Sequence, residues 1–103
     1  AAATATAAPT AFDVVQMKRL VAIGEALPRE QEPFVALVAN MSAAASAEPV
    51  CVGVNAVASS ADATQHGEIV AVQNCSRILA ERGGGVDWRR LALYTTAEPC
   101  PMC

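Results

Sequence analysis

Residues 62–75 read DATQHGEIVAVQNC, and this stretch decides the fold of the middle of the chain. From Gln65 to about Arg82 apolar residues recur at helical spacing, and the glycines at 83–85 end the run. The apolar face of this helix carries Ile69, Val72, Cys75 and Leu79. A helix with so apolar a face is predicted to pack deeply against a sheet.

A second stretch, LYTTAEPCPMC at residues 93–103, carries a Cys-x-x-Cys pair. Residues 91–96 predict a strand, and Pro99 stands where a new helix would begin. Cys100 and Cys103 would then lie in the first turn of that helix. The free N–H groups and the dipole of a helix N-terminus favour the thiolate form of such cysteines.

One imidazole and two thiolates supply three ligands for a zinc ion. His66 lies at the predicted start of the helix over 65–82, and Cys100 and Cys103 supply the thiolates. Three protein ligands leave a fourth position for water, as in catalytic zinc sites. Glu68, two residues after the histidine, would then carry protons rather than bind the metal.

Each part of this pattern is weak by itself. A lone histidine is more often a surface or core residue than a ligand, and a lone Cys-x-x-Cys can be a redox pair or half of a zinc ribbon. The combination of H-x-E with P-C-x-x-C after a strand is far more specific, because it is the known signature of zinc deaminases.

The rest of the chain predicts one helix and a hairpin. Residues 13–27 have helical spacing, with Asp13 as the N-cap and Gln16 as its reciprocal partner. Residues 34–41 (FVALVANM) read as a strand covered on both faces, and residues 50–55 (VCVGVN) as its antiparallel neighbour. The order of elements (helix, strand, strand, helix, strand, start of helix) is typical of an α/β domain.

Length and charge limit the classes of protein that this sequence can represent. The 103 residues suit one domain, and a net charge of −3 offers no strong basic field for nucleic-acid phosphates. No run approaches the roughly 18 apolar residues that a membrane helix needs. We therefore expect no membrane partner, and nucleic acid is a less favoured one. Arg89 and Arg90 beside Trp88 form the one basic and aromatic cluster. Such a cluster could stack on and hold nucleic acid, but we favour the interpretation as a solvated turn.

The N-terminus and two further cysteines bear on location. Residues 1–12 (AAATATAAPTAF) read as a low-complexity Ala/Thr tail or as the remnant of a processed leader. Cys51 and Cys75 lie inside apolar runs, where free buried thiols are common. We therefore expect a reducing compartment and a cytoplasmic location.

Over residues 13–103 the sequence resembles the cytidine-deaminase-like superfamily of zinc-dependent deaminases, through the stretches at 62–75 and 93–103. The resemblance implies an α/β fold with three α-β-α layers and a mixed central sheet, of which this chain would be the N-terminal two-thirds. It also implies the roles of individual residues. The metal ligands for one Zn²⁺ would be His66, Cys100 and Cys103, the proton carrier Glu68, and the substrate-binding residues Asn55 and Gly67.

The implied activity is hydrolytic deamination of an amino-substituted nucleobase or nucleoside, of cytosine or guanine type, with release of ammonia. ATQHGEI and LYTT resemble fungal-type cytosine deaminases, whereas AEPCPMC resembles guanine deaminases and tRNA adenosine deaminases. The alternatives are a tRNA-directed adenosine deaminase of the same fold and a non-catalytic zinc-binding module. Relatives usually pair, so we expect a homodimer for the full-length protein. We expect residues 1–103 alone to be unstable or inactive, with little affinity for zinc.

Overall fold

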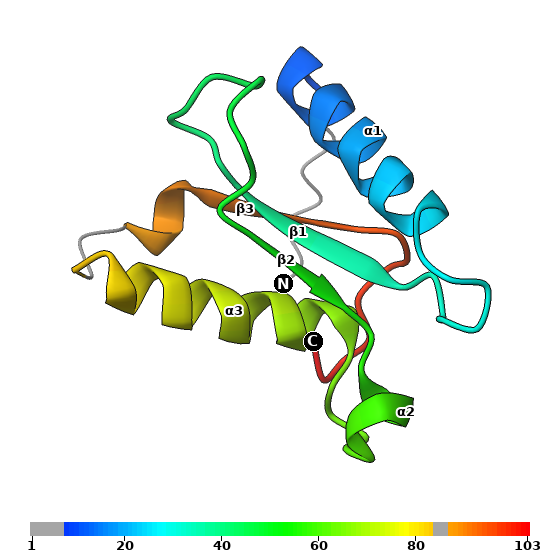
Figure 1. Cartoon of the computed structure of the whole chain (residues 1–103). Helices are drawn as coiled ribbons and strands as arrows, with labels where there is room; N and C mark the ends of the chain where they lie inside the picture. The colour runs from blue at the N-terminus through cyan, green and yellow to red at the C-terminus, as the bar shows by residue number, and fades with distance from the viewer. Residues whose placement is uncertain (1–7, 84–86) are drawn as a thin grey trace.

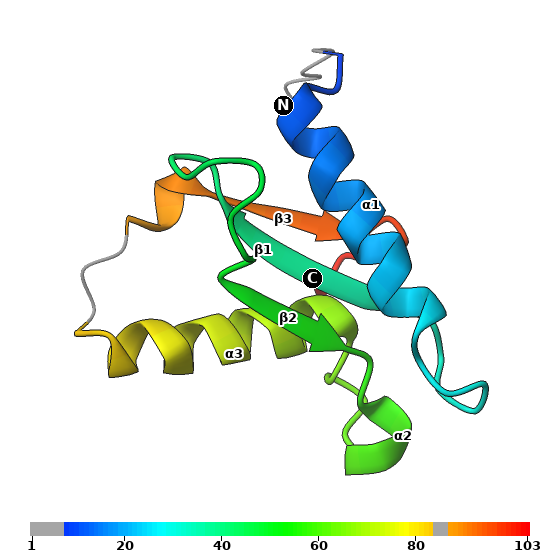
Figure 2. The same cartoon turned by 45° about the horizontal axis from the view of Figure 1, so that its top comes forward.

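A three-stranded sheet lies between two long helices (Figures 1 and 2). The computed structural model describes residues 8–83 and 87–103. The strands are β1 (Val35–Asn40), β2 (Cys51–Val54) and β3 (Leu91–Thr95), in the order β2-β1-β3. Helix α1 (Ala11–Glu25) covers one face and α3 (Gly67–Glu81) the other. A short helix α2 (Val57–Ser60) precedes α3, and a 3₁₀ turn η1 (Trp88–Arg90) precedes β3.

Both strand pairs are antiparallel, which confirms the predicted hairpin of β1 and β2. The parallel pairing that a mixed sheet requires is not found among these three strands. Because β2 and β3 both run opposite to β1, they point in the same direction and end at the same edge of the sheet. The segments that follow β2 and β3 therefore meet at that edge.

The central strand β1 is buried on both faces, as its continuous apolar run predicts. Ala36 and Val38 pack toward α3, together with Cys51, Ala71 and Cys75. The alternate residues of β1 pack toward α1, where they surround the fully buried Leu20. The sheet thus contributes to two small cores, one under each helix.

The buried face of α3 differs from the predicted one. Its buried residues are Gly67, Ala71, Cys75 and Leu79, whereas Val72 is 42% exposed. The buried stripe repeats every four residues and is built of small side chains at its start. This allows the first turns of α3 to approach β2 closely. Gly83, with a φ of 91°, follows the helix as expected, and Gly84 and Gly85 lie outside the described residues.

The first helix begins earlier than the sequence suggested. Thr10 is its N-cap, and the Thr10 hydroxyl and the Asp13 carboxylate each accept a hydrogen bond from the other's backbone N–H. Asp13 is therefore the third helical residue rather than the cap. Gln16 is buried instead, and its amide donates to the Ala45 carbonyl at 3.1 Å. Of the predicted tail, the last two residues are helical, and residues 1–7 lie outside the described part.

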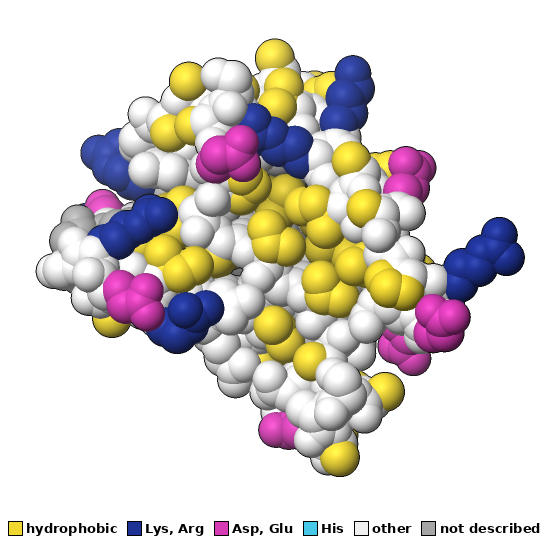
Figure 3. All heavy atoms as spheres, in the orientation of Figure 1, with side chains coloured by type: hydrophobic (Ala, Val, Ile, Leu, Met, Phe, Trp, Pro, Cys, Tyr) yellow, Lys and Arg dark blue, Asp and Glu magenta, His cyan; other side chains and the backbone are white. Residues whose placement is uncertain are grey.

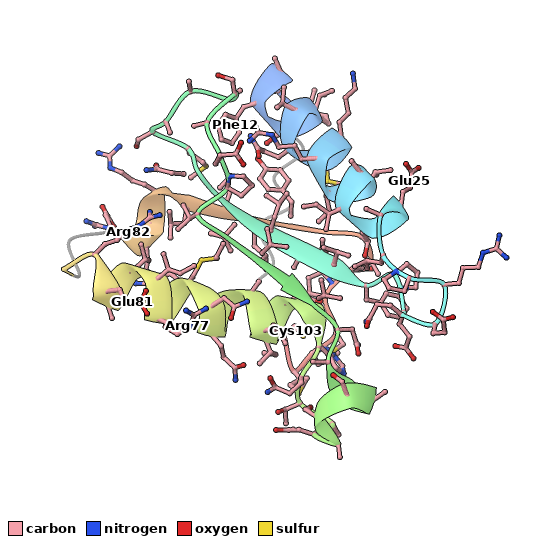
Figure 4. The ribbon with its side chains drawn as sticks, in the orientation of Figure 1. Phe12, Glu25, Arg77, Glu81, Arg82 and Cys103 are labelled. Carbon is pink, nitrogen blue, oxygen red and sulfur yellow. A yellow bond between two sulfur atoms is a disulfide. The ribbon has the colours of Figure 1, made fainter. Side chains whose placement is uncertain are left out.

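Two further expectations are corrected. Cys51 of β2 and Cys75 of α3 form a disulfide rather than two free thiols (Figure 4). The alternation of β2 and the buried stripe of α3 turn the two side chains toward each other, with their Cα atoms 5.2 Å apart. The helix expected after Pro99 is a single turn, closed by the Cys103 N–H donating to the Cys100 carbonyl at 2.9 Å.

The surface seen in Figure 3 is mainly apolar at its centre, between the positions of α1 and α3, and most charged side chains lie around this area. None of the described helices is both long enough and apolar enough to cross a bilayer.

Candidate metal centre and its pocket

The three predicted metal ligands meet at the edge of the sheet where β2 and β3 end. The Nδ1 atom of His66 lies 3.6 Å from the Sγ of Cys100 and 3.7 Å from the Sγ of Cys103. The two sulfur atoms are 3.8 Å apart. His66 and Cys100 are half-buried, and Cys103 is exposed.

These separations match the edges of a tetrahedron around one zinc ion. With Zn–S bonds of about 2.3 Å and Zn–N bonds of about 2.05 Å, tetrahedral angles place two sulfur ligands about 3.8 Å apart and a sulfur and a nitrogen about 3.6 Å apart. The observed triangle has edges of 3.8, 3.6 and 3.7 Å. The donor set and its geometry therefore fit zinc, with room for a fourth ligand.

Local structure explains why the chain delivers these donors. His66 is the N-cap of α3 and has an extended backbone, so its ring projects from the helix start toward the sheet edge. Cys100 and Cys103 lie in the single turn that follows β3. Figure 4 shows Cys103 beside the first turns of α3, with Glu81 and Arg82 at the other end of that helix.

Two glycines set the close approach of α3 to the sheet. A Cβ on Gly53 in β2 would overlap the backbone nitrogen of Ala71 and the carbonyl oxygen of Gly67. A Cβ on Gly67 would lie 2.9 Å from the carbonyl oxygen of Phe34. The start of α3, which carries the predicted ligand His66, thus has a fixed depth over the sheet. Gly53 was not predicted to have a role, although an isolated glycine inside a strand indicates that another backbone segment approaches it closely.

The two free thiols have different pKa values because of their different surroundings. The backbone N–H of Cys103 is the main group that lowers the pKa of Cys100. Partial loss of water around its sulfur, followed by hydrogen bonding to the Glu68 carboxylate and to Cys100, raises the pKa of Cys103 to about 12. The site thus stabilises one thiolate and opposes a second. A bound cation would reverse that opposition, because it stabilises both thiolates at once.

A cavity of about 280 Å³ opens beside the ligands. Its lining contains the predicted residues Asn55, Gly67 and Glu68 together with the predicted ligands His66 and Cys100. The sequence did not single out the other lining residues, which are Glu32, Phe34, Thr96, Ala97 and Glu98. They come from the segments before β1 and after β3, whose proximity depends on strand order.

Asn55 is held at the end of β2 by three hydrogen bonds. Its backbone N–H donates to the Phe34 carbonyl at 3.0 Å, and its carbonyl accepts from the Gln31 amide at 2.8 Å. Its Oδ1 accepts from the Val57 N–H at 3.0 Å. Since Oδ1 is engaged, the amide N–H₂ group is the part of Asn55 that is left to donate to a molecule in the cavity.

Comparison with known proteins bears on what this site is. Residues 14–103 match the family described as cytidine and deoxycytidylate deaminase zinc-binding region. Guanine deaminase of Bacillus subtilis (strain 168) is 39% identical over 51 residues, which are 50% of this chain and 30% of that protein.

A solved structure agrees with the sequence match and confirms the α/β fold class. The X-ray structure of guanine deaminase from Bacillus subtilis superposes with a TM-score of 0.54 at 25% identity, over 87% of this chain and 48% of that one. The chain thus spans less than half the length of these relatives. Because the family match covers nearly the whole sequence, the chain belongs to the cytidine and deoxycytidylate deaminase family.

Proposed function

We propose that the protein is a zinc-dependent hydrolytic deaminase of an amino-substituted nucleobase, with guanine as the first substrate to test. The observation that carries this proposal is the triangle of His66, Cys100 and Cys103, whose edges of 3.6–3.8 Å suit one tetrahedral zinc. Glu68 lies close enough to the triangle for its carboxylate to help raise the pKa of Cys103. A site that served structure alone would have no use for such a carboxylate. Similarity to a guanine deaminase supports the choice of substrate.

The residues of this chain would divide the work in a defined way. The Nδ1 of His66 and the sulfurs of Cys100 and Cys103 would hold the metal. Zinc bound there would supply Lewis acidity that activates a water molecule near neutral pH. The first two residues of α3, Gly67 and Glu68, line the same cavity.

Glu68 would act as the general acid and base. Its carboxylate takes a proton from the attacking water and gives it to the ring nitrogen of the base. It then takes the remaining hydroxyl proton and gives it to the leaving amine. The water oxygen becomes the carbonyl oxygen of the product, the C–N bond breaks, and ammonia leaves.

Asn55 and Gly67 would orient the base. The free amide N–H₂ of Asn55 is a donor for an acceptor atom on the ring or its substituent. The backbone of Gly67 lines the floor of the cavity, where only a residue without a Cβ avoids the Phe34 carbonyl. Fixed donors of this kind discriminate strongly between polar substrates.

The test is ammonia release by the full product of the gene, loaded with zinc. Guanine, cytosine, cytidine and an adenosine in a tRNA stem-loop are compared. We expect turnover of a free base, one zinc per chain, and loss of both zinc and turnover in Cys103→Ser. The exposed neighbour Met102 provides the matched control, because Met102→Ala alters the same turn without removing a donor. Zinc-free active protein, or zinc without ammonia release from any of the four, would overturn the proposal.

A further inference from the structure

The cavity beside the metal ligands is lined by three carboxylates. Glu32, Glu68 and Glu98 all line it, and no Lys or Arg is found among the described residues of its wall. The proposed mechanism uses only Glu68. Two negative charges in the wall are therefore left without a role in the reaction.

We propose that Glu32 and Glu98 make this cavity selective for substrates without a phosphate, so that a base or nucleoside is accepted and the corresponding nucleotide is rejected. The inference rests on the proposed function, since it concerns the substrate of the same site. The distinction between nucleoside and nucleotide matters in this family, because it includes deaminases of cytidine, a nucleoside, and of deoxycytidylate, a nucleotide.

Hydrogen bonds on both sides of Glu32 hold the backbone of the segment before β1 beside the cavity. The Gln31 amide donates to the Asn55 carbonyl at 2.8 Å. The Thr96 hydroxyl donates to the Pro33 carbonyl at 3.2 Å and accepts from the Val35 N–H at 3.1 Å. The backbone around Glu32 is therefore tied to the segments that follow both β2 and β3.

Glu98 lines the same cavity from a different segment, between β3 and the proposed ligand Cys100. The Thr96 N–H donates to the Val35 carbonyl at 3.1 Å, and the Thr95 hydroxyl donates to the Ala97 carbonyl. These bonds fix the backbone of residues 95–97, directly before Glu98, at the edge of the sheet. A ligand in the cavity would thus have a carboxylate from each of the two segments beside it.

Repulsion of a phosphate dianion follows from these charges. In water, two like unit charges on the order of 10 Å apart lower affinity about twofold, so a dianion loses about fourfold to each carboxylate. Salt screens the effect at this distance, since the Debye length is about 8 Å at physiological ionic strength. A neutral base or nucleoside escapes the penalty, and its N–H groups can donate to the same carboxylates.

The experiment measures binding without turnover. Dissociation constants are determined by calorimetry in low salt, using zinc-loaded Glu68→Gln protein, for the pairs guanosine and GMP, and cytidine and CMP. The same is done after adding Glu32→Gln, Glu98→Gln or both. Glu30→Gln is the matched control, because it removes one exposed charge from the same segment without lining the cavity.

We expect the nucleoside to bind at least tenfold more tightly than its nucleotide. Each of Glu32→Gln and Glu98→Gln should reduce that ratio about fourfold, and Glu30→Gln should change it less than twofold. Equal binding of both members of a pair, or a ratio that the double variant leaves unchanged, would overturn the selectivity. Active protein that prefers nucleotides would overturn it while leaving the deaminase proposal intact. Selective binding without ammonia release in the unmutated protein would overturn the deaminase proposal alone. Failure of both nucleosides to bind would overturn the selectivity alone, because the proposed substrate of the deaminase is a free base.

Discussion

Gly53 in β2 lies directly against Gly67 at the start of α3, so that a methyl group on Gly53 would overlap the carbonyl oxygen of Gly67. The cluster of His66, Cys100 and Cys103 depends on this contact, because His66 precedes Gly67 and its ring reaches the two sulfurs from the end of the helix. A substitution at Gly53, which has no reactive side chain, would therefore disturb the position of His66.

Gly53→Ala should destabilise the protein by about 3 kcal/mol, since the overlapping atoms belong to backbone and cannot rotate away. Urea unfolding gives the free energy. Gly24→Ala is the control within α1, where the nearest atom to the new Cβ is a Val35 methyl at 3.9 Å. That variant should gain about 0.5–1 kcal/mol, as alanine favours a helix over glycine. Equal effects of the two changes would contradict this account of the contact.

Reducing the bond between Cys51 and Cys75 should cost about 3 kcal/mol of unfolding free energy, because it closes a loop with a sequence separation of 24. The number of free thiols is measured by alkylation and mass spectrometry without reductant. Two reactive thiols in the denatured, metal-free chain are expected, namely Cys100 and Cys103. Four would support the sequence-based view that Cys51 and Cys75 are free thiols.

The hydroxyl of Tyr94 donates to the Asp13 carboxylate at 2.6 Å and is the main group that lowers the pKa of Asp13 from 3.8. A carboxyl group whose pKa is lower in the folded than in the unfolded state stabilises the fold at a pH above its unfolded-state pKa. This stabilisation is lost as the pH falls through the folded-state pKa. The stability difference between wild type and Tyr94→Phe should therefore shrink below about pH 4. Urea midpoints at pH 6, 4 and 3 measure it, and a constant difference would argue against the coupling.

The same pair predicts an effect in alkali. Loss of hydration, followed by the Asp13 hydrogen bond, raises the pKa of Tyr94 from 10.0 to about 12. A group whose pKa is higher in the folded than in the unfolded state stabilises the fold at a pH below its unfolded-state pKa. This stabilisation is lost as the pH rises through the folded-state pKa. Ultraviolet titration should show phenolate forming near pH 12 in the wild type. In Asp13→Asn it should form at a lower pH, and an unchanged titration would show that Asp13 has no part in it.

Asn55→Asp separates the local role of this side chain from its proposed role in binding. The remaining oxygen can still accept from the Val57 N–H, now 3.0 Å away, so stability should change little. The N–H₂ donor is lost, and kcat/KM for the base should fall about tenfold or more. Asn55→Ala should reduce both. Should Asn55→Asp retain full activity, Asn55 would have no role in binding the base.

The sequence predicted the parts of this fold that depend on local pattern. The apolar runs of β1 and β2, the long helix with His66 at its start, and the Cys-x-x-Cys turn lie where expected. The cap of α1 was misplaced because Thr10 and Asp13 form a capping box that lies partly inside an apparently featureless tail. Val72 was misplaced because small residues rather than large ones mark the closest approach of α3.

The site was predicted only as far as its motifs reach. The motifs H-x-E and C-x-x-C predicted the residues that the structure brings together, because few functions other than metal binding and proton transfer use these side chains in this combination. Glu32 and Thr96 carry no such motif, and they reach the cavity through strand order and through backbone hydrogen bonds between distant segments. The Cys51–Cys75 bond likewise depends on the register of β2 against α3, which spacing alone does not give.

The role of Glu68 as proton carrier beside a zinc ion is tested by the zinc content and the ammonia release of Glu68→Gln, measured on one preparation beside the wild type. We expect one zinc per chain in both proteins, because Glu68 is not among the three proposed ligands. We expect ammonia release to fall about 10²–10⁴-fold, because the variant lacks the general acid–base group. A variant that keeps its activity, or one that loses its zinc, would contradict the role given to Glu68.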